Sequence, residues 1–335
     1  MTSPLPIKFY QTGTFTVGNR LLDVSVRSVQ SDSQRNNSLN SGHRACQGCG
    51  EALGARYALD AAMRAVNGRL VVANATGCLE VFSTPYPESS WRVAWLHSLF
   101  ANAAAVGTGM AAAMKVKGRT DVRVIAQGGD GGTVDIGFAC LSGMFERNDD
   151  VLYICYDNEA YMNTGVQRSS ATPAGARTAT TPAVGEAPGN VMNQGKNVPL
   201  IAMAHFIPYV ATASVADLRD LETKVDKAMR VHGARYLHVH VPCPLGWGCD
   251  TGDTIKVARL AAESGLYPIF EAEYGEITGR RMIRKRVPVD EYLKLQSRFS
   301  HLFKTTEGRA RVAQIQAIAD RNIARFGLVP EGAPA

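Results

Sequence analysis

The sequence has no long apolar run and no segment that resembles a secretion signal, and these absences exclude several classes of protein. Its longest apolar stretches, 69–75 and 111–114, are far shorter than the roughly 20 residues that span a bilayer. Residues 1–10 contain no basic segment followed by an apolar core, so we predict no signal peptide. Hydrophobic residues make up 45% of the chain and charged residues 20%, as in ordinary globular proteins. We therefore predict a cytoplasmic protein that does not enter the membrane.

A strong charge of either sign is also lacking, because 36 basic residues are offset by 30 acidic ones. The densest basic run, 280–286, has no interleaved aromatic residues and matches no nucleic-acid-binding motif. Isolated charge runs of this kind are usually solvated. We predict a solvated face or a contact with an acidic partner here, and no nucleic-acid binding.

The seven cysteines are odd in number, and without a secretion signal they do not predict a disulfide framework. Binding of a metal or a cofactor is the better interpretation for closely spaced cysteines. Cys140 and Cys155 fall inside a predicted helix and a predicted strand, where a lone cysteine is usually a small core residue. The other five lie near predicted element ends: Cys46, Cys49, Cys78, Cys243 and Cys249.

From residue 43 onward, apolar runs typical of buried strands alternate with segments of helical periodicity. We expect strands at 69–75, 122–126, 151–156, 207–212, 236–241 and 269–274, and helices at 51–66, 99–115, 135–145, 215–231, after 253 and within 290–326. This alternation predicts an α/β fold with a mostly parallel sheet and helices on both faces. Ligands of such sheets bind in the loops at the carboxyl ends of strands.

We expect three regions along the chain. Residues 1–42 form an N-terminal extension, with a weak strand at 15–26 and a polar, flexible connector at 28–41. Residues 43–290 form the main domain, and residues 291–335 form a helical C-terminal tail.

The loop after the second strand contains Asp130 between two pairs of glycines, Gly128-Gly129 and Gly131-Gly132, and leads into a predicted helix. Glycines let backbone amides approach a phosphate closely, and a carboxylate is a common Mg²⁺ ligand. A single Gly-Asp-Gly sequence is most often only a tight turn, and this one matches neither the GxGxxG nor the GxxxxGK[ST] pattern.

A second motif follows the next strand and makes the first one more specific. Asn158 and Ala160 come directly after 151–156, so they are expected beside Asp130 at the same edge of the sheet. The Asn158 side chain and the Ala160 carbonyl would offer further oxygen ligands to the same cation. This combination of a Gly-Asp-Gly turn, a helix, a strand and an asparagine resembles the thiamine diphosphate motif.

Cys46 and Cys49 form a CxxC pair at the start of a predicted helix, which suits a redox dithiol, half of a zinc site or part of an iron–sulfur site. No thioredoxin-like strand precedes the pair, and no second CxxC or HxxxH follows it. Cys78 and Cys243 each follow a predicted strand, so thiolates from three loops would complete a 4Fe–4S site. Cys249 remains an alternative to Cys243.

Several segments together resemble the β subunit of pyruvate:ferredoxin oxidoreductase, the thiamine-diphosphate-binding subunit of a 2-oxoacid:acceptor oxidoreductase. They are HRACQGCGEALGAR (43–56), ATGCLEVFSTPYPESSW (75–91), GGDGGTVDIG (128–137), YDNEAYMNTGVQRSS (156–170) and CPLGW (243–247). The similarity covers roughly residues 43–300, and it leaves residues 1–42 unexplained.

The resemblance implies a role for each matching residue. Its 4Fe–4S ligands correspond to Cys46, Cys49, Cys78 and Cys243, and its Mg²⁺ ligands to Asp130, Asn158 and the Ala160 carbonyl. Asn163 would face the reacting end of the cofactor as the catalytic residue. The other positions close to the cofactor are Glu51, Thr76, Gly77, Cys78, Gly129, Gly131 and Thr164.

The resemblance also implies an activity, the coenzyme A-dependent oxidative decarboxylation of a 2-oxoacid, most commonly pyruvate. Thiamine diphosphate, Mg²⁺ and a 4Fe–4S cluster would be bound, and electrons would leave one at a time. An α subunit would complete the cofactor site, and γ and ferredoxin-like δ subunits would belong to the same complex. The final acceptor would be external ferredoxin or an NAD-linked subunit. We therefore expect an obligate hetero-oligomer.

Three alternatives remain open. The same framework could act on another 2-oxoacid, such as an aryl-glyoxylate or oxalate. The chain could instead be a non-catalytic electron-transfer or scaffold subunit, although that role needs no Gly-Asp-Gly and asparagine pair. A non-oxidative thiamine decarboxylase or synthase would need a longer chain that carries both cofactor domains.

Overall fold

The structure is a computed structural model that describes residues 37–85, 89–185, 189–192 and 195–330. The chain divides into the units Met1–Asn37 and Ser38–Ala335, and of the first unit only Asn37 is described. The strand predicted at 15–26 therefore lies outside the described residues, as does most of the connector predicted at 28–41. The region boundaries at 42/43 and 290/291 stay predictions.

The described end of that connector packs against the rest of its unit, and the flexibility of the connector stays a prediction. Ser38 and Leu39 are buried. The backbone amide of Ser38 donates to Asp60 Oδ1 at 2.6 Å, and Leu39 pairs with Trp91 in an isolated antiparallel bridge. One apolar side chain and one buried partner suffice to fix a segment whose average composition is polar.

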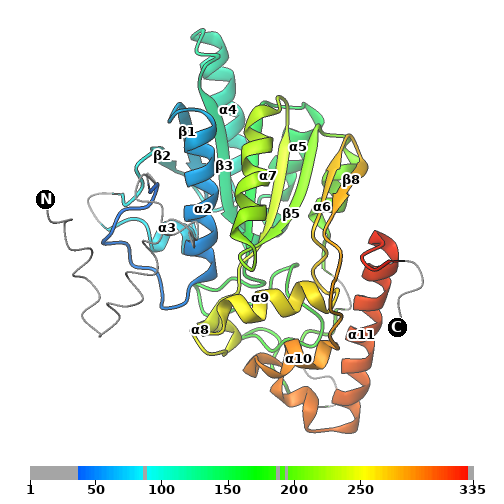
Figure 1. Cartoon of the computed structure of the whole chain (residues 1–335). Coiled ribbons are helices and arrows are strands. Elements are labelled where there is room, and N and C mark those ends of the chain that lie inside the picture. The colour runs from blue at the N-terminus through cyan, green and yellow to red at the C-terminus, as the bar shows by residue number, and fades with distance from the viewer. Residues whose placement is uncertain (1–36, 86–88, 186–188, 193–194, 331–335) are drawn as a thin grey trace, which may run out of the picture. The chain divides into compact units, whose positions relative to one another are not determined.

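The centre of the second unit is a sheet that has eight strands within the described residues, in the order β2-β1-β3-β4-β6-β5-β7-β8 (Figure 1). The first six strands of this order, β2, β1, β3, β4, β6 and β5, are parallel to one another. At the other edge, β7 pairs antiparallel with β5, and β8 pairs antiparallel with β7. The strands are β1 (Leu70–Asn74), β2 (Ala94–His97), β3 (Arg123–Gly129), β4 (Val151–Asp157), β5 (Tyr209–Ser214), β6 (Arg235–His240), β7 (Phe270–Glu273) and β8 (Glu276–Arg280). The prediction of a mostly parallel sheet is confirmed.

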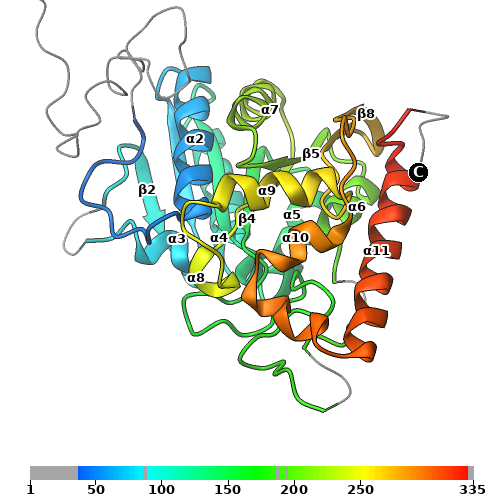
Figure 2. The same ribbon diagram turned by 60° about the horizontal axis from the view of Figure 1, so that its bottom comes forward.

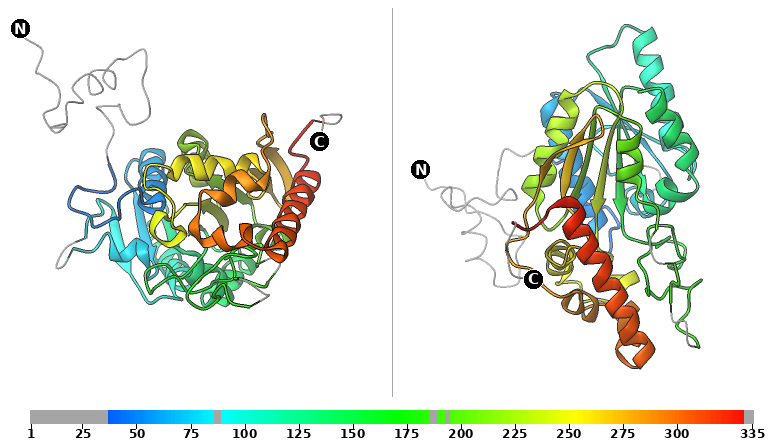
Figure 3. Two further views of the ribbon diagram at one scale, coloured as in Figure 1. Left: turned by 90° about the horizontal axis from the view of Figure 1, so that it is seen from below. Right: turned by 90° about the vertical axis from the view of Figure 1, so that its right-hand side faces the viewer.

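Helices cover both faces of this sheet, which confirms the predicted fold class (Figures 1 and 3). Helices α2 (Gly50–Ala65) and α7 (Leu218–Arg230) pack on one face. On the other face lie α4 (Ala103–Val116), α5 (Phe138–Glu146) and α6 (Val198–Ala204). Their apolar side chains form one core with the strands, which includes Ala104, Val124, Leu141, Phe145, Val151 and Ala202.

A layer of helices lies across the carboxyl ends of the strands (Figure 2). It contains α8 (Pro244–Trp247), α9 (Thr254–Glu263), α10 (Val289–Lys294), the 3₁₀ segment η4 (Ser297–Phe303) and α11 (Thr306–Phe326). These helices have a core of their own around Trp247, Tyr292, Phe299 and Ile315. We call them the C-terminal layer, and they lie where ligands bind in sheets of this kind.

The structure contains elements that the sequence pattern did not predict. They are the edge strands β2 and β8, helix α6, and the short helices α3 (Cys78–Val81) and α8. In the part of the chain that the structure describes, no helix is long and apolar enough to cross a membrane.

Candidate active site

The Gly-rich turn after β3 is closely packed against two neighbouring loops. Asp130 leads directly into a single π-helical turn, η3 (Gly131–Asp135), and α5 follows it. A Cβ atom at Gly131 would lie 2.6 Å from the ring of Tyr161, and one at Gly132 would lie 3.0 Å from the Phe100 carbonyl oxygen. The glycine at 131 is therefore required by packing, and it leaves the backbone of the turn without side chains that would block a ligand.

Asp130 is a buried carboxyl group to which no cationic side chain of the described residues donates a hydrogen bond. It is 1% exposed and accepts a hydrogen bond from Ser169 Oγ at 2.5 Å. Burial raises the pKa of Asp130 well above 3.8, and Asp157 and Glu51 raise it further, whereas the Ser169 bond lowers it. A carboxyl group in such surroundings binds either a proton or a cation. A bound Mg²⁺ would supply the missing positive charge.

The loop after β4 presents a second polar group without a full set of partners. Asn158 Nδ2 donates to Glu51 Oε2 at 2.8 Å, whereas Asn158 Oδ1 is buried and has no hydrogen-bond partner among the described residues. An orphaned buried acceptor costs about 1–3 kcal/mol, which a cation ligated by that oxygen would offset. Because Gly129 of β3 lies opposite Tyr156 of β4, Asp130 and Asn158 leave the sheet at the same edge. Both residues fit the predicted Mg²⁺ site.

Glu51 lies between these two groups and the cysteines. It is 3% exposed at the start of α2. Burial raises the pKa of Glu51 to about 7, although hydrogen bonds from Asn158 and from the backbone of Leu79 oppose the shift. A carboxyl group that titrates near neutral pH beside a cavity is typical of a functional site.

Four cysteines line one cavity at this edge of the sheet: Cys46, Cys49, Cys78 and Cys243. Cys249 is not among the residues that line it. The same cavity is also lined by Glu51, Asn158 and Asn163. The structure thus brings the predicted cluster ligands and part of the predicted cofactor site to one place.

The local structure prepares two of these thiols to bind as thiolates. Cys49 and Cys243 are the N-cap residues of α2 and α8, and their Sγ atoms accept backbone hydrogen bonds from Ala52 at 3.3 Å and Gly246 at 3.4 Å. Burial nevertheless raises the pKa of Cys49 to about 12 and that of Cys243 to about 11, and the nearby Glu51 adds to both shifts. Burial and Glu51 raise the pKa of Cys78 as well. Iron would supply the charge that keeps such thiols deprotonated.

Within the described ranges, no three His, Cys, Asp or Glu side chains are grouped closely enough to bind one metal ion together. In a 4Fe–4S cluster each cysteine binds a different iron, so the ligands surround a space and do not converge on one point. Four thiols around one cavity fit that arrangement.

The remaining predicted site residues lie in the surrounding loops. Thr76 Oγ1 donates to the Ser98 carbonyl at 3.1 Å and lies 2.8 Å from His97 Nε2, and Gly77 follows it before α3. Ala160 is 3% exposed, whereas Thr164 is exposed and bonded to the Gln167 side chain. Gly129 is the last residue of β3.

The sequence interpretation missed three residues that contact the predicted cation site or its loop: Ser169 donates to Asp130, Trp247 donates to the Asn158 carbonyl, and Arg298 pairs with Glu159. Ser169 and Trp247 stand inside the motif segments 156–170 and 243–247 but had been given no role. Arg298 is 139 positions away from Glu159, with which it forms an ion pair, and no pattern in the sequence connects them.

The fold is that of a thiamine diphosphate-binding enzyme domain. The family model for the thiamine pyrophosphate enzyme, C-terminal TPP binding domain, matches residues 75–239, and thiamine pyrophosphate is another name for the same compound. The match begins after β1 and includes the Gly-rich turn and the loop after β4.

Two relatives narrow this class. Pyruvate synthase subunit PorB of Methanosarcina barkeri is 51% identical over 291 residues, which cover 87% of this chain and 97% of that protein. Ketoisovalerate oxidoreductase subunit VorB of Pyrococcus abyssi is 43% identical over 270 residues, which cover 78% of this chain and 85% of that protein. The chain belongs to the family of 2-oxoacid:ferredoxin oxidoreductase β subunits that includes PorB, and the predicted oxidoreductase class is confirmed.

A solved structure agrees with this fold. The 2-oxoglutarate:ferredoxin oxidoreductase of Magnetococcus marinus superposes with a TM-score of 0.53 at 24% identity, over 66% of this chain and 79% of that one. At this level of identity the similarity supports the fold.

Proposed function

We propose that this chain is the thiamine-diphosphate-binding subunit of a coenzyme A-dependent 2-oxoacid oxidoreductase that acts on pyruvate. The observation that carries the proposal is the shared cavity, because the four cysteines and the polar residues Glu51, Asn158 and Asn163 line the same space. When bound, thiamine diphosphate stabilises the negative charge left on the substrate after carbon dioxide leaves. A 4Fe–4S cluster in the same cavity would be placed to receive single electrons.

Each part of the site has a defined task in this proposal. Asp130, Asn158 and the Ala160 carbonyl hold Mg²⁺, and the backbone at Gly129 and Gly131 leaves room for the diphosphate. Cys46, Cys49, Cys78 and Cys243 hold the 4Fe–4S cluster. Asn163 orients the substrate at the reacting end of the cofactor, with Thr76, Gly77 and Thr164 around it. Glu51 is buried between the Mg²⁺ site and the four cysteines, and it excludes water from the space between them.

Partner subunits complete the enzyme. The name pyruvate synthase subunit PorB, carried by the 51% identical relative, belongs to one subunit of a larger assembly. We propose an α subunit that covers the pyrimidine end of the cofactor, together with γ and ferredoxin-like δ subunits. External ferredoxin or an NAD-linked subunit would take up the electrons. Bound coenzyme A in the oxidoreductase of similar fold is consistent with coenzyme A as the acyl acceptor.

A panel of 2-oxoacids on the complex, purified without oxygen, tests the proposal. With thiamine diphosphate, Mg²⁺ and coenzyme A present, we expect pyruvate to give the highest kcat/KM for acceptor reduction. The second candidate substrate is ketoisovalerate, which the 43% identity to VorB favours. Aryl-glyoxylates and oxalate complete the panel. A complex that contains iron and thiamine diphosphate but reduces an acceptor with none of these acids would refute the proposal.

A further inference from the structure

The backbone between the proposed cation ligands Asn158 and Ala160 has an unusual conformation. Glu159, the residue between them, has φ 68, in the left-handed region. Residues with a Cβ atom enter this region at a cost in free energy, and they remain there when surrounding contacts enforce it. The positions of the Asn158 side chain and the Ala160 carbonyl depend on this residue, because it sets the direction of the chain between them.

Packing alone does not hold Glu159 in place. On one side its loop faces a cavity of about 280 Å³, bordered by Asp157, Glu159, His240 and residues of the C-terminal layer. A side chain beside such a space is free to change its conformation unless specific polar contacts prevent it. The Glu159 amide donates to Asp157 Oδ1 at 2.8 Å, His240 Nε2 lies 3.5 Å from Glu159 Oε1, and three further contacts reach the loop from outside β4 and β6.

Two of the contacts bind the main chain of the loop. Trp247 Nε1 donates to the Asn158 carbonyl at 2.8 Å, and Thr172 Oγ1 donates to the Glu159 carbonyl at 2.6 Å. The third binds the side chain, because Arg298 pairs with the Glu159 carboxylate. The Glu159 side chain is 12% exposed and that of Arg298 is 4% exposed, so this ion pair is buried.

Trp247 and Arg298 act as one unit. The Arg298 guanidinium lies 3.9 Å from the centroid of the Trp247 ring, and both residues are 3% or less exposed. Trp247 ends α8 and Arg298 belongs to η4, so both come from the C-terminal layer. That layer lies after the matched segment 75–239.

We propose that Trp247 and Arg298 are positioning residues that hold Asn158-Glu159-Ala160 in the conformation that binds the cation. The inference rests on the proposed function, in which this loop ligates the Mg²⁺ of thiamine diphosphate. The C-terminal layer then has a role in cofactor binding, although none of its residues needs to touch the cofactor.

Two conservative variants test this inference in the purified complex. Trp247→Phe keeps an aromatic ring beneath Arg298 but removes the Nε1–H donor, and Arg298→Lys keeps the charge but removes the planar group that stacks. The measured quantity is the dissociation constant of Mn²⁺, followed by its EPR signal in the presence of thiamine diphosphate. Loss of a residue that orients a metal ligand typically weakens binding 10–100-fold, and we expect about this effect in both variants.

Matched controls separate positioning from general loss of stability. Arg235→Lys alters another buried arginine that pairs with a carboxylate, that of Asp150. This pair lies at the amino-terminal ends of the strands, away from the proposed cation site. Trp91→Phe alters another buried tryptophan, whose Nε1 has no hydrogen-bond partner among the described residues. We expect both controls to bind Mn²⁺ as the unaltered complex does, even where the melting temperature of Arg235→Lys falls.

The Mn²⁺ affinities of the variants, the controls and the unaltered complex decide whether the inference, the proposed function or both hold. Unchanged Mn²⁺ affinity in Trp247→Phe and Arg298→Lys would overturn the inference and leave the proposed function standing. Equal weakening in the two controls would overturn it as well, because the effect would then be one of stability. If the unaltered complex showed no thiamine-diphosphate-dependent Mn²⁺ binding, both the inference and the proposed cofactor site would fail.

Discussion

At the scale of single residues, the contact between Ser169 and Asp130 controls the charge of the proposed cation site. Both side chains are buried, and the Ser169 hydroxyl donates to Asp130 Oδ2 at 2.5 Å while its oxygen accepts from the Ala171 amide. The bond lowers a carboxyl pKa that burial raises. Ser169 therefore favours the ionised form of Asp130 that binds a cation.

Replacement of this serine should weaken cation binding. In Ser169→Ala we expect the Mg²⁺ dissociation constant, measured with saturating thiamine diphosphate, to rise about tenfold, because the ligand loses the partner that orients and ionises it. Isothermal titration calorimetry on the purified complex measures this constant.

Ser264→Ala is the matched control for that variant. Ser264 is equally buried, but its hydroxyl donates to the Ala261 carbonyl at the end of α9. An equal loss of affinity in both variants would contradict the role given to Ser169.

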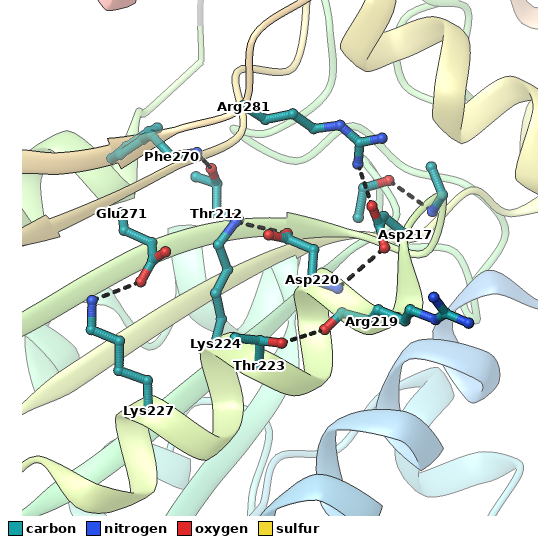
Figure 4. Close-up of polar contacts among 12 residues, drawn as sticks. Thr212, Asp217, Arg219, Asp220, Thr223, Lys224, Lys227, Phe270, Glu271 and Arg281 are labelled. Carbon is teal, nitrogen blue, oxygen red and sulfur yellow. Dashed lines mark hydrogen bonds and ion pairs between the residues drawn. The ribbon is translucent and has the colours of Figure 1, made fainter. Parts of the chain in front are cut away.

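At the scale of elements, α7 is fixed to the sheet by a buried lysine (Figure 4). Lys224 Nζ donates to the Thr212 carbonyl of β5 at 2.9 Å and to Asp220 Oδ2 at 2.7 Å, and its side chain is 4% exposed. In Lys224→Met the carboxyl group of Asp220 and the carbonyl of Thr212 lose this donor. We expect the free energy of unfolding in urea to fall by about 1–3 kcal/mol.

Lys227 offers a control on the same helix. It pairs with Glu271 and Glu273 at 3.0 Å each, but its side chain is 40% exposed. Lys227→Met should change the free energy of unfolding by only about 0–1 kcal/mol, as for other solvated pairs. Equal effects of the two substitutions would show that the burial of Lys224 has no consequence.

A charge cluster lies at the amino-terminal ends of β4 and β6, away from the proposed cofactor site. Its contribution to the stability of the fold depends on pH. Burial tends to raise the pKa of Asp150, but Arg235, His232 and Arg123 together hold that pKa below 3.8. A carboxyl group with a lower pKa in the folded chain stabilises the fold above its unfolded pKa, and this contribution disappears as pH falls through the folded value.

This sign gives a test with Asp150→Asn. At about pH 7, we expect a higher free energy of unfolding for the unaltered chain than for the variant. The reason is that the variant leaves the buried Arg235 without its charged partner. The side chain of Asp150 is 42% exposed, so we expect a difference of about 1–3 kcal/mol, less than for a fully buried pair. The difference should shrink once the pH falls below about 4. A difference that stays constant down to pH 3 would contradict this account.

The sequence predicted the strands that have apolar residues in a run or in alternation, including β7, in which only every second residue is buried. Strands β4 and β6 are buried throughout; β4 is apolar or aromatic up to Tyr156, whereas β6 also contains Arg235, His238 and His240. The edge strands β2 and β8 were missed because they have no run of buried apolar residues. Three of the four residues of β2 are exposed, and β8 has no buried residue. Helix α6 was missed because it follows a long segment rich in Ser, Thr, Pro and Gly.

The site could be predicted only where its residues stand in local motifs. The Gly-Asp-Gly turn, the CxxC pair and Asn158 each follow or begin an element, so position in the sequence gave their position in space. Arg298 could not be found in this way, because its contact with Glu159 joins residues brought together only by the packing of the C-terminal layer. The buried orphan atom of Asn158 is likewise a property of the folded chain alone.

At the scale of the whole molecule, the proposed cofactor site borders a surface suited to a partner subunit. Leu99, in the loop after β2, is 72% exposed, and Ile136, directly after η3, is 58% exposed. Contiguous exposed apolar patches mark interaction sites, and we propose that these two side chains belong to one. We expect Leu99→Asp and Ile136→Asp to weaken assembly with the subunit that completes the site.

Native mass spectrometry of the co-expressed subunits measures that assembly. Val116→Asp is the control, because Val116 is 88% exposed at the end of α4, towards the opposite ends of the strands. Full assembly of the Leu99 and Ile136 variants would contradict the proposed interface, and so would an equal loss with Val116→Asp.

We propose that one cavity of this chain holds an iron–sulfur cluster next to thiamine diphosphate. The most direct test is the iron and sulfide content of the full chain, reconstituted without oxygen, in the unaltered form and in two serine variants. Cys243 lines the cavity and Cys249 does not. We predict about four iron and four sulfide per chain in the unaltered protein and in Cys249→Ser, and a loss of most of both in Cys243→Ser. Full iron content in Cys243→Ser, or its loss in Cys249→Ser alone, would contradict the account.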